Sequence, residues 1–280
     1  MVDHGWINIS GNESLDTLQV GPITVDDYAF VDGIRLAPPE GVDFEVHCYE
    51  AVLSLAPSTQ GSQLHGRPLF VHMIDNGILA KNMFALHLRE PMEISLGMLN
   101  RVLIHGDMIV VPLTNETGRD ITGSWQTRID SIALGNHSGV QFSLDGTTAA
   151  FSTRDTFIQL PDDIVWALLM ELDFIMDEMS LPPYVPCGQR SSMPDIIFTL
   201  AGQDLTLTPY DYTLEWILGS EWTYCVSAMV PSPIIGSKEV ILGSSFLRPF
   251  YSVFDLDNKS IGCKLSCTLT KKKREVNDIN

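Results

Sequence analysis

The feature that most constrains the fold of this chain is the spacing of its short β-prone runs, which recur roughly every eight to twelve residues. β-branched and aromatic residues fill these runs, and Gly, Asn, Asp and Pro separate them, as in strands joined by turns. The clearest runs are DTLQVG (16–21), VHCYEAVLSLA (46–56), HGDMIVVPLT (105–114), SWQTRIDSIALG (124–135), DIIFTLAG (195–202) and YSVFDLDNKSIG (251–262). The sequence therefore predicts an all-β fold with a few short helices.

Three windows interrupt the strand pattern. RPLFVHMIDNGIL (67–79) has apolar residues at helical spacing and then Gly77, which favours a helix end. PDDIVWALLMELDFIMDEM (161–179) opens with Pro161 and two acidic residues, as the first turn of a helix prefers. PYDYTLEWI (209–217) is either one helical turn or a loop.

Length and charge limit the classes of protein that remain. A chain of 280 residues is as compatible with two lobes as with one, and its 45% hydrophobic residues exclude wholesale disorder. Its net charge of -18 argues against binding nucleic acid, because an acidic surface repels phosphates. No apolar run reaches the roughly 18 residues of a membrane span. The opening MVDHGWINIS (1–10) lacks a secretory signal pattern, so the chain is expected to be cytoplasmic.

The sequence offers no pattern for a metal or cofactor site. The cysteines include no CxxC pair, the histidines include no HExxH motif, and no glycine-rich phosphate loop is present. Five N-x-S/T sequons would be glycosylated only in a secreted protein and otherwise indicate turns rich in hydroxyls. They begin at Asn8, Asn12, Asn115, Asn136 and Asn258.

Four segments resemble, in order, motifs of the pepsin-like aspartic endopeptidases (peptidase A1), and most closely those of fungal members. PLFVHMIDNGILAKNMFALHL (68–88) resembles the helix and strand that lead from the first lobe to the second. GSWQTRIDSIALG (123–135) and SMPDIIFTLAGQDLTLTPYDYTLE (192–215) resemble two strand segments of the second lobe. EVILGSSFLRPFYSVFDLDNKSIG (239–262) resembles the closing segment at nearly every position.

This resemblance implies a bilobal β fold with a substrate cleft between the lobes. The expected division is a partial N-terminal lobe at 1–104 that starts near the flap, a C-terminal lobe at 105–270 and a polar tail at 271–280. The resemblance also implies a disulfide between Cys187 and Cys225. The alternative is a pair of buried thiols, which a cytosolic location favours.

Catalysis in this family needs two carboxylates that share one proton, and each lobe supplies one from a D-T/S-G loop. In TTAAFSTRDTFIQLP (147–161) the resemblance places Ser152, Thr153 and Arg154 where the second D-T-G belongs. The aspartate is therefore a serine, and an arginine occupies a glycine position where the tight turn is expected to have no room for a side chain. Asp155 could be the catalytic residue only if the register shifted against its matched neighbours.

The N-terminal segment GWINISGNESLDTLQVG (5–21) resembles the flap hairpin and the strand after it, with His4 where the flap tyrosine would be. The first D-T-G loop would lie upstream of the sequence in hand. Neither catalytic motif is therefore expected in this chain, and no residue is assigned as catalytic by the family motif.

These observations lead to three hypotheses. The first is a non-proteolytic pepsin-fold protein whose interlobe cleft binds a peptide or small apolar ligand. The second is a recruited enzyme of isomerase or cyclase type in fungal secondary metabolism. The third is residual aspartic endopeptidase activity.

In the first two hypotheses, Ser152, Thr153, Arg154 and Asp155 are candidate cleft residues, and Arg154 could bind an anionic or carbonyl group. Neutral drift after catalysis was lost would explain the same residues. The shortened lobe could also contact a protein partner or a second copy. No cofactor, nucleic acid or membrane is expected.

Overall fold

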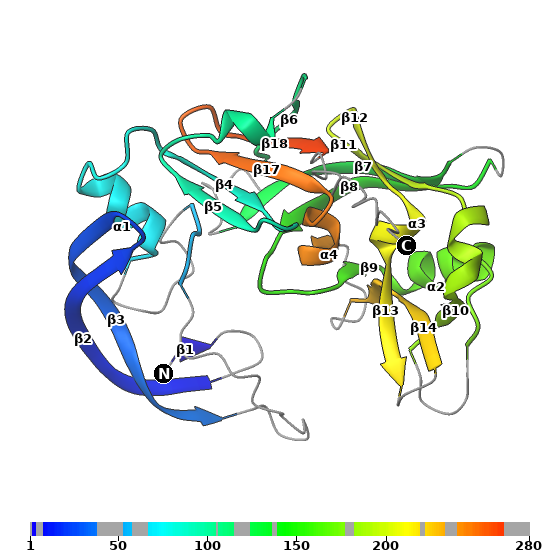
Figure 1. Ribbon diagram of the computed structural model, residues 1–280, viewed down its shortest axis with the longest axis horizontal. Helices are drawn as coiled ribbons and strands as arrows, with labels where there is room; N and C mark the ends of the chain where they lie inside the picture. Colours follow the sequence, from blue (N-terminus) through cyan, green and yellow to red (C-terminus); the bar gives the residue numbers. More distant parts are fainter. Residues whose placement is uncertain are drawn as a thin grey trace, which may run out of the picture.

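The computed structural model describes residues 2–3, 8–37, 53–57, 67–104, 106–114, 124–135, 139–176, 182–218, 222–232 and 240–265. Across these ranges strands dominate and the helices are few and short, as Figure 1 shows. The all-β prediction is confirmed. In the same ranges, no helix is long and apolar enough to cross a membrane.

The N-terminal residues form a long antiparallel ribbon, here called the ribbon sheet. Its strands, in spatial order, are β1 (Val2–Asp3), β2 (Asn8–Val20) and β3 (Ile23–Ala37). Gly21 allows the tight turn between β2 and β3 because its φ is +57°. Near this turn the ribbon packs its Val25 and Tyr28 against Leu69 and Met73 of helix α1 (Leu69–Asp75). The ribbon sheet, blue in Figure 1, therefore packs against α1 at one end of the molecule.

The central sheet takes strands from both halves of the sequence. Its spatial order is β5 (Glu93–Leu96), β4 (Met83–His87), β17 (Phe250–Asp255), β18 (Ser260–Leu265) and β6 (Ile109–Pro112), with all neighbours antiparallel. Every residue of β4 and β17 is buried, including the polar His87, Ser252 and Asp255, so neither strand shows the apolar–polar alternation of a half-exposed strand. The predicted lobe boundary at 104/105 falls between strands of this sheet and remains a prediction.

The large sheet forms most of the second half. Its spatial order is β12 (Gln203–Leu207), β11 (Ile196–Leu200), β7 (Trp125–Leu134), β8 (Gln141–Phe151), β16 (Val240–Leu242), β9 (Ile158–Leu160) and β15 (Met229–Pro231). Strand β16 runs parallel to β8 and antiparallel to β9. This arrangement brings the chain after β8 next to the chain after β16.

A smaller sheet lies beside the large one, at the end of the molecule opposite the ribbon (Figure 1). Its order is β10 (Tyr184–Pro186), β14 (Trp222–Ser227) and β13 (Thr213–Leu218). The remaining helical elements are η1 (Arg101–Leu103), α2 (Asp162–Glu171), η2 (Cys187–Ser192), α3 (Pro209–Tyr212) and α4 (Ser244–Leu247).

One aromatic cluster joins the central sheet to the large sheet. Phe84 of β4 stacks on Phe254 of β17 with ring centroids 4.7 Å apart, and the Trp125 ring of β7 meets both at 5.5 and 5.3 Å. Phe70 of α1 contacts Phe84 at 5.1 Å. The apolar core is therefore continuous from α1 into the second half of the chain.

Both predicted helices form, and their ends have the same geometry. After α1, the Gly77 and Ile78 amides donate to carbonyls of the last turn, and Gly77 has φ +63°. After α2, Asp173 takes this left-handed position with φ +56°. The predicted helix over 161–179 therefore stops at Glu171, because an aspartate serves as the C-terminal stop that the sequence pattern assigns to glycine.

The other strand and helix predictions divide into three outcomes. The runs at 16–21, 105–114, 124–135, 195–202 and 251–262 each contain a strand. The window at 209–217 is one helical turn followed directly by β13, so the helical alternative was right only for its first residues. The run at 46–56 falls largely outside the described residues, and its described part, 53–56, is not a strand.

Candidate functional site

The candidate site is the loop between β8 and β9, here called the 152–157 loop, together with the chain that follows β16. The Ser152 amide donates to the Leu242 carbonyl at 3.1 Å. The Ser244 and Ser245 amides donate to the carbonyls of Asp155 and Thr156 at 2.7 and 3.0 Å. Backbone hydrogen bonds therefore fix the loop from its first residue to its last turn.

Gly243 allows the two segments to approach so closely. A Cβ atom at this position would lie 2.2 Å from the Phe157 carbonyl oxygen and 2.6 Å from that of Asp155. Backbone atoms cannot move aside as the end of a flexible side chain can, so only glycine fits here. Gly243 belongs to the closing segment (239–262) that resembles the family.

The Asp155 carboxylate accepts hydrogen bonds from its own loop and from β9. The Ser152 hydroxyl donates to Oδ2 at 2.7 Å, and the Gln159 amide donates to Oδ1 at 3.1 Å. The Arg154 Nε lies 3.7 Å from Oδ2. With only 14% of its side chain exposed, Asp155 acts as the centre of a local hydrogen-bond network.

The structure brings together three of the four predicted site residues. Ser152 and Arg154 lie at the carboxylate of Asp155, whereas Thr153 is exposed at the loop surface. The Arg154 side chain is 56% exposed, and Arg154 does not have a positive φ. The expected lack of room at this position is therefore wrong, because this loop directs the side chain toward solvent.

Gln159 is a site residue that the sequence pattern did not indicate. It sits in β9, one position after the buried Ile158, where a polar residue is ordinary strand alternation. Only the fold places its amide against Asp155. Among the described residues, no group of three or more His, Cys, Asp or Glu side chains could hold a metal ion.

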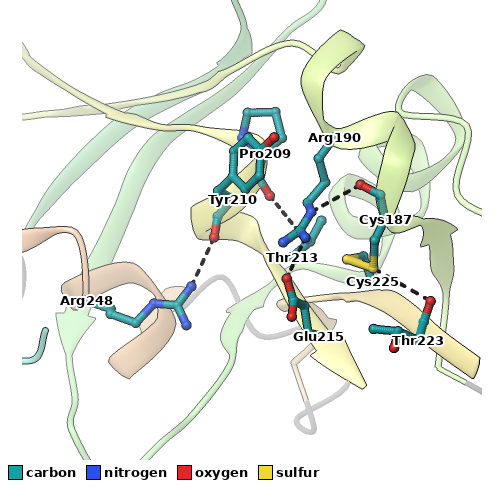
Figure 2. A network of polar contacts seen from close by, with 9 residues as sticks. All are labelled: Cys187, Arg190, Pro209, Tyr210, Thr213, Glu215, Thr223, Cys225 and Arg248. Atoms are coloured by element: carbon teal, nitrogen blue, oxygen red, sulfur yellow. Dashed lines mark hydrogen bonds and ion pairs between the residues drawn. A yellow bond between two sulfur atoms is a disulfide. The ribbon is translucent and has the colours of Figure 1, made fainter. Parts of the chain in front are cut away.

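A second polar cluster lies at the small sheet, and Figure 2 shows it around Arg190 of η2. The Arg190 guanidinium donates to Glu215 Oε1 at 2.5 Å and to the Cys187 carbonyl at 3.3 Å. The same guanidinium stacks over the Tyr210 ring, 4.7 Å from its centroid. The Arg248 guanidinium donates to the Tyr210 carbonyl at 3.1 Å. These contacts connect η2, α3, β13 and the end of α4.

A disulfide joins Cys187 of η2 to Cys225 of β14 (Figure 2). The alternative of two buried thiols is therefore wrong. The bond is possible because η2 begins where β10 ends, and β10 pairs with β14 directly beside Cys225. It anchors the helix that carries Arg190.

An ion pair connects the central sheet to α3. Arg89, two residues beyond β4, donates to Asp211 Oδ1 at 2.5 Å. Asp211 is almost fully buried and also accepts from the Thr208 amide and hydroxyl, at 3.0 and 2.6 Å. This capping box begins α3 and fixes the carboxylate that faces Arg89.

The comparisons with known proteins agree with this architecture. A family model for eukaryotic aspartyl proteases matches residues 2–265. Vacuolar protease A of Aspergillus fumigatus is 30% identical over 271 residues, covering 93% of this chain and 63% of that protein. Cathepsin D of Dictyostelium discoideum is 29% identical, covering 93% of this chain and 66% of that protein.

The structural comparison shows the same fold. A crystal structure of an aspartic proteinase from Irpex lacteus superposes with a TM-score of 0.75 at 20% identity, covering 96% of this chain and 81% of that one. The chain spans less than two thirds of the length of these curated relatives. The bilobal, pepsin-like expectation is confirmed, and this chain belongs to the eukaryotic aspartyl protease family.

Proposed function

We propose that this protein is a member of the family that does not cleave peptides and that binds a peptide or a small apolar molecule instead. The proposal rests on the sequence TTAAFSTRDTFIQLP (147–161), whose resemblance to the family places Ser152 where the second catalytic aspartate belongs. A hydroxyl cannot share a proton with a carboxylate as the family reaction requires. The reaction needs one carboxylate from each lobe, so the loss of the aspartate from the second lobe is enough to prevent it.

The geometry of Asp155 supports the proposal. Its two carboxylate oxygens accept from Ser152 and Gln159, and Arg154 lies beside them. A general base must be free to accept a proton from water in hydrogen-bonding range. Both oxygens of the Asp155 carboxylate already accept hydrogen bonds from the protein, which makes Asp155 less available to take a proton from water.

The experiment is a cleavage assay of the purified chain on unfolded casein at about pH 4 and about pH 7, with peptides detected by mass spectrometry. We expect no cleavage at either pH. The matched variants are Asp155→Asn and Asp162→Asn, which remove one carboxylate from the loop and one from the exposed first turn of α2. Cleavage that Asp155→Asn abolishes and Asp162→Asn retains would overturn the proposal and assign Asp155 as a catalytic residue.

A recruited enzyme of isomerase or cyclase type is the second candidate. The exposed Arg154 guanidinium and the Ser152 hydroxyl both lie near Asp155 Oδ2, which favours it because the two groups together could orient a carbonyl or anionic group. Thermal melting with an apolar and an acidic acetylated hexapeptide separates the two candidates, since a ligand raises the melting temperature of the protein it binds. A shift that Arg154→Gln abolishes only for the acidic peptide favours the anion-orienting loop.

A further inference from the structure

We propose that Asn12 and Asn258 carry N-linked glycans and that the chain folds in an oxidising secretory compartment. Both residues begin sequons, Asn12-Glu13-Ser14 and Asn258-Lys259-Ser260, without proline at the middle position. Of the sequons in the chain, these two have an asparagine whose exposure the structure describes, and both are exposed. The inference concerns modification and is independent of the proposed function.

Asn258 lies in the turn between β17 and β18, a place that can accommodate a glycan. Its amide nitrogen Nδ2 donates to Asp255 Oδ2 at 2.8 Å, and its backbone amide donates to Asp255 Oδ1 at 2.9 Å. A side-chain amide has two N–H donors. Glycosylation replaces one hydrogen, so the other can still donate to Asp255 and the turn keeps its geometry.

The transfer needs one co-reactant, an oligosaccharide on a lipid-linked diphosphate. Nδ2 forms a bond to the anomeric carbon of the sugar while the bond from that carbon to the diphosphate breaks. Nδ2 loses one proton, and the diphosphate carrier is the leaving group. No oxidant or reductant is involved.

Asn12 lies on β2, where a glycan would have a protective effect. Strand β1 pairs only with Asn8 and Ile9, so in the described part of the chain the rest of this β2 edge has no neighbouring strand. Leu15, three residues further along, is 68% exposed. An open strand edge with exposed apolar residues invites pairing with another chain. A glycan at Asn12 would shield that edge.

The Cys187–Cys225 bond is independent support for the compartment. Disulfides form and persist in oxidising compartments and are rare in the cytosol. Cys263, the free cysteine among the described residues, is 1% exposed, so it is protected from exchange with that bond. The expectation of a cytoplasmic protein makes the opposite prediction about both features, and each feature has its own test.

The experiment produces residues 1–280 in yeast behind a cleavable secretion leader and measures the intact mass before and after treatment with the N-glycosidase PNGase F. This enzyme converts each glycosylated asparagine to aspartate, which peptide mass spectrometry then locates. Asn12→Gln and Asn258→Gln should each remove one glycan. Ser14→Ala and Ser260→Ala, which break the sequons but keep the asparagines, should do the same. Asn76→Gln, at an exposed asparagine outside any sequon, should change nothing.

Two results would overturn the inference. One is a folded, secreted protein in which Asn12 or Asn258 is unmodified. This result would show that the unmodified asparagine is not a glycosylation site. The other concerns the disulfide. Protein made in the reducing bacterial cytosol, with both thiols free, should melt at a lower temperature than the same protein oxidised, because the cross-link restricts the unfolded chain. Equal melting temperatures would remove the argument for an oxidising compartment.

Discussion

Gly243 is the residue on which the geometry of the 152–157 loop depends most directly. It lies between β16 and α4, and both carbonyls that a Cβ would meet belong to the loop. Gly188, in η2, offers a contrast, since a Cβ there would meet no described heavy atom within 4 Å. One glycine is required by a close approach of two backbones, and the other is not.

Substitution of these two glycines should therefore have opposite effects. Gly243→Ala should lower the free energy of unfolding by about 3 kcal/mol, because the added methyl forces backbone segments apart. Gly188→Ala should leave it unchanged or raise it by about 0.5 kcal/mol, because alanine restricts the unfolded chain. Urea denaturation followed by circular dichroism measures both. Equal stability of the two variants would mean that the 152–157 loop does not pack on Gly243.

At the same scale, the sequence could indicate part of the site but not all of it. Ser152 and Asp155 are three residues apart in one loop, so a local pattern is enough to place them together. Gln159 reaches Asp155 only because β9 begins where the loop folds back. Strand alternation predicts a polar residue at 159 but not which atom it will contact.

Among the ion pairs of the described residues, Arg89–Asp211 spans the greatest sequence separation and joins the end of β4 to the first turn of α3 across 122 positions of the chain. Asp211 has 4% of its side chain exposed and Arg89 has 29%. A buried carboxylate that loses its partner is costly, whereas the surface pair Arg128–Asp130, 51% and 23% exposed, should matter little.

Arg89→Met should lower the free energy of unfolding by about 2 kcal/mol, because it leaves the Asp211 carboxylate without its charge partner. The control Arg128→Met should change it by less than about 1 kcal/mol. Chemical denaturation of both variants at low and high salt provides the measurement. If the two variants lose the same stability, the α3 contact is no stronger than a surface pair.

The ends of helices and the starts of strands were only partly predictable from the sequence. The end of α1 was predictable because Gly77 provides a familiar stop. The end of α2 was not, because Asp173 adopts a left-handed conformation that the chain context imposes. The strand β13 directly after α3 was likewise hidden, since PYDYTLEWI has the apolar spacing of either a helix or a strand.

At the scale of the whole molecule, burial raises the pKa of a cysteine thiol and of two tyrosine hydroxyls. Burial raises the pKa of the Cys263 thiol from 9.0 to about 12, and the Ser252 side chain opposes this in part. Burial also raises the pKa of Tyr212, with Asp195 adding to the shift, and that of Tyr28. Each group is more easily deprotonated in the unfolded chain, so alkaline pH favours unfolding.

The free energy of unfolding should therefore fall as the pH becomes alkaline. The stability contributed by the neutral Cys263 thiol is fully present below about pH 9 and is lost as the pH rises toward about 12. We expect the free energy of unfolding to fall in this range by on the order of 1 kcal/mol per pH unit. Cys263→Ala should make the fall shallower without removing it, because the tyrosines remain. An unchanged slope in the variant, measured by denaturation at stepped pH, would contradict the assignment to Cys263.

The overall fold was predictable from sequence because four ordered segments match one family, and each lies where strands are buried or paired. The pairing between distant strands was not visible from local pattern alone. Nothing in MFALH indicates that β4 will lie beside FYSVFD of β17, since both are mostly apolar and neither specifies a partner strand. The fold was predicted from the family resemblance, and the individual strands and helices were predicted from local sequence patterns.

The strand order of the central sheet also has a consequence for synthesis. Strands β4 and β5 are translated before every strand of the large sheet, yet β17, which lies between β4 and β18, is translated after all of them. While the ribosome is still working, β4 has one paired edge and one open edge, and the aromatic cluster lacks Phe254. The central sheet can therefore be completed only after β17 and β18 have been translated, and a nascent chain stalled before Phe250 would expose its core to chaperones.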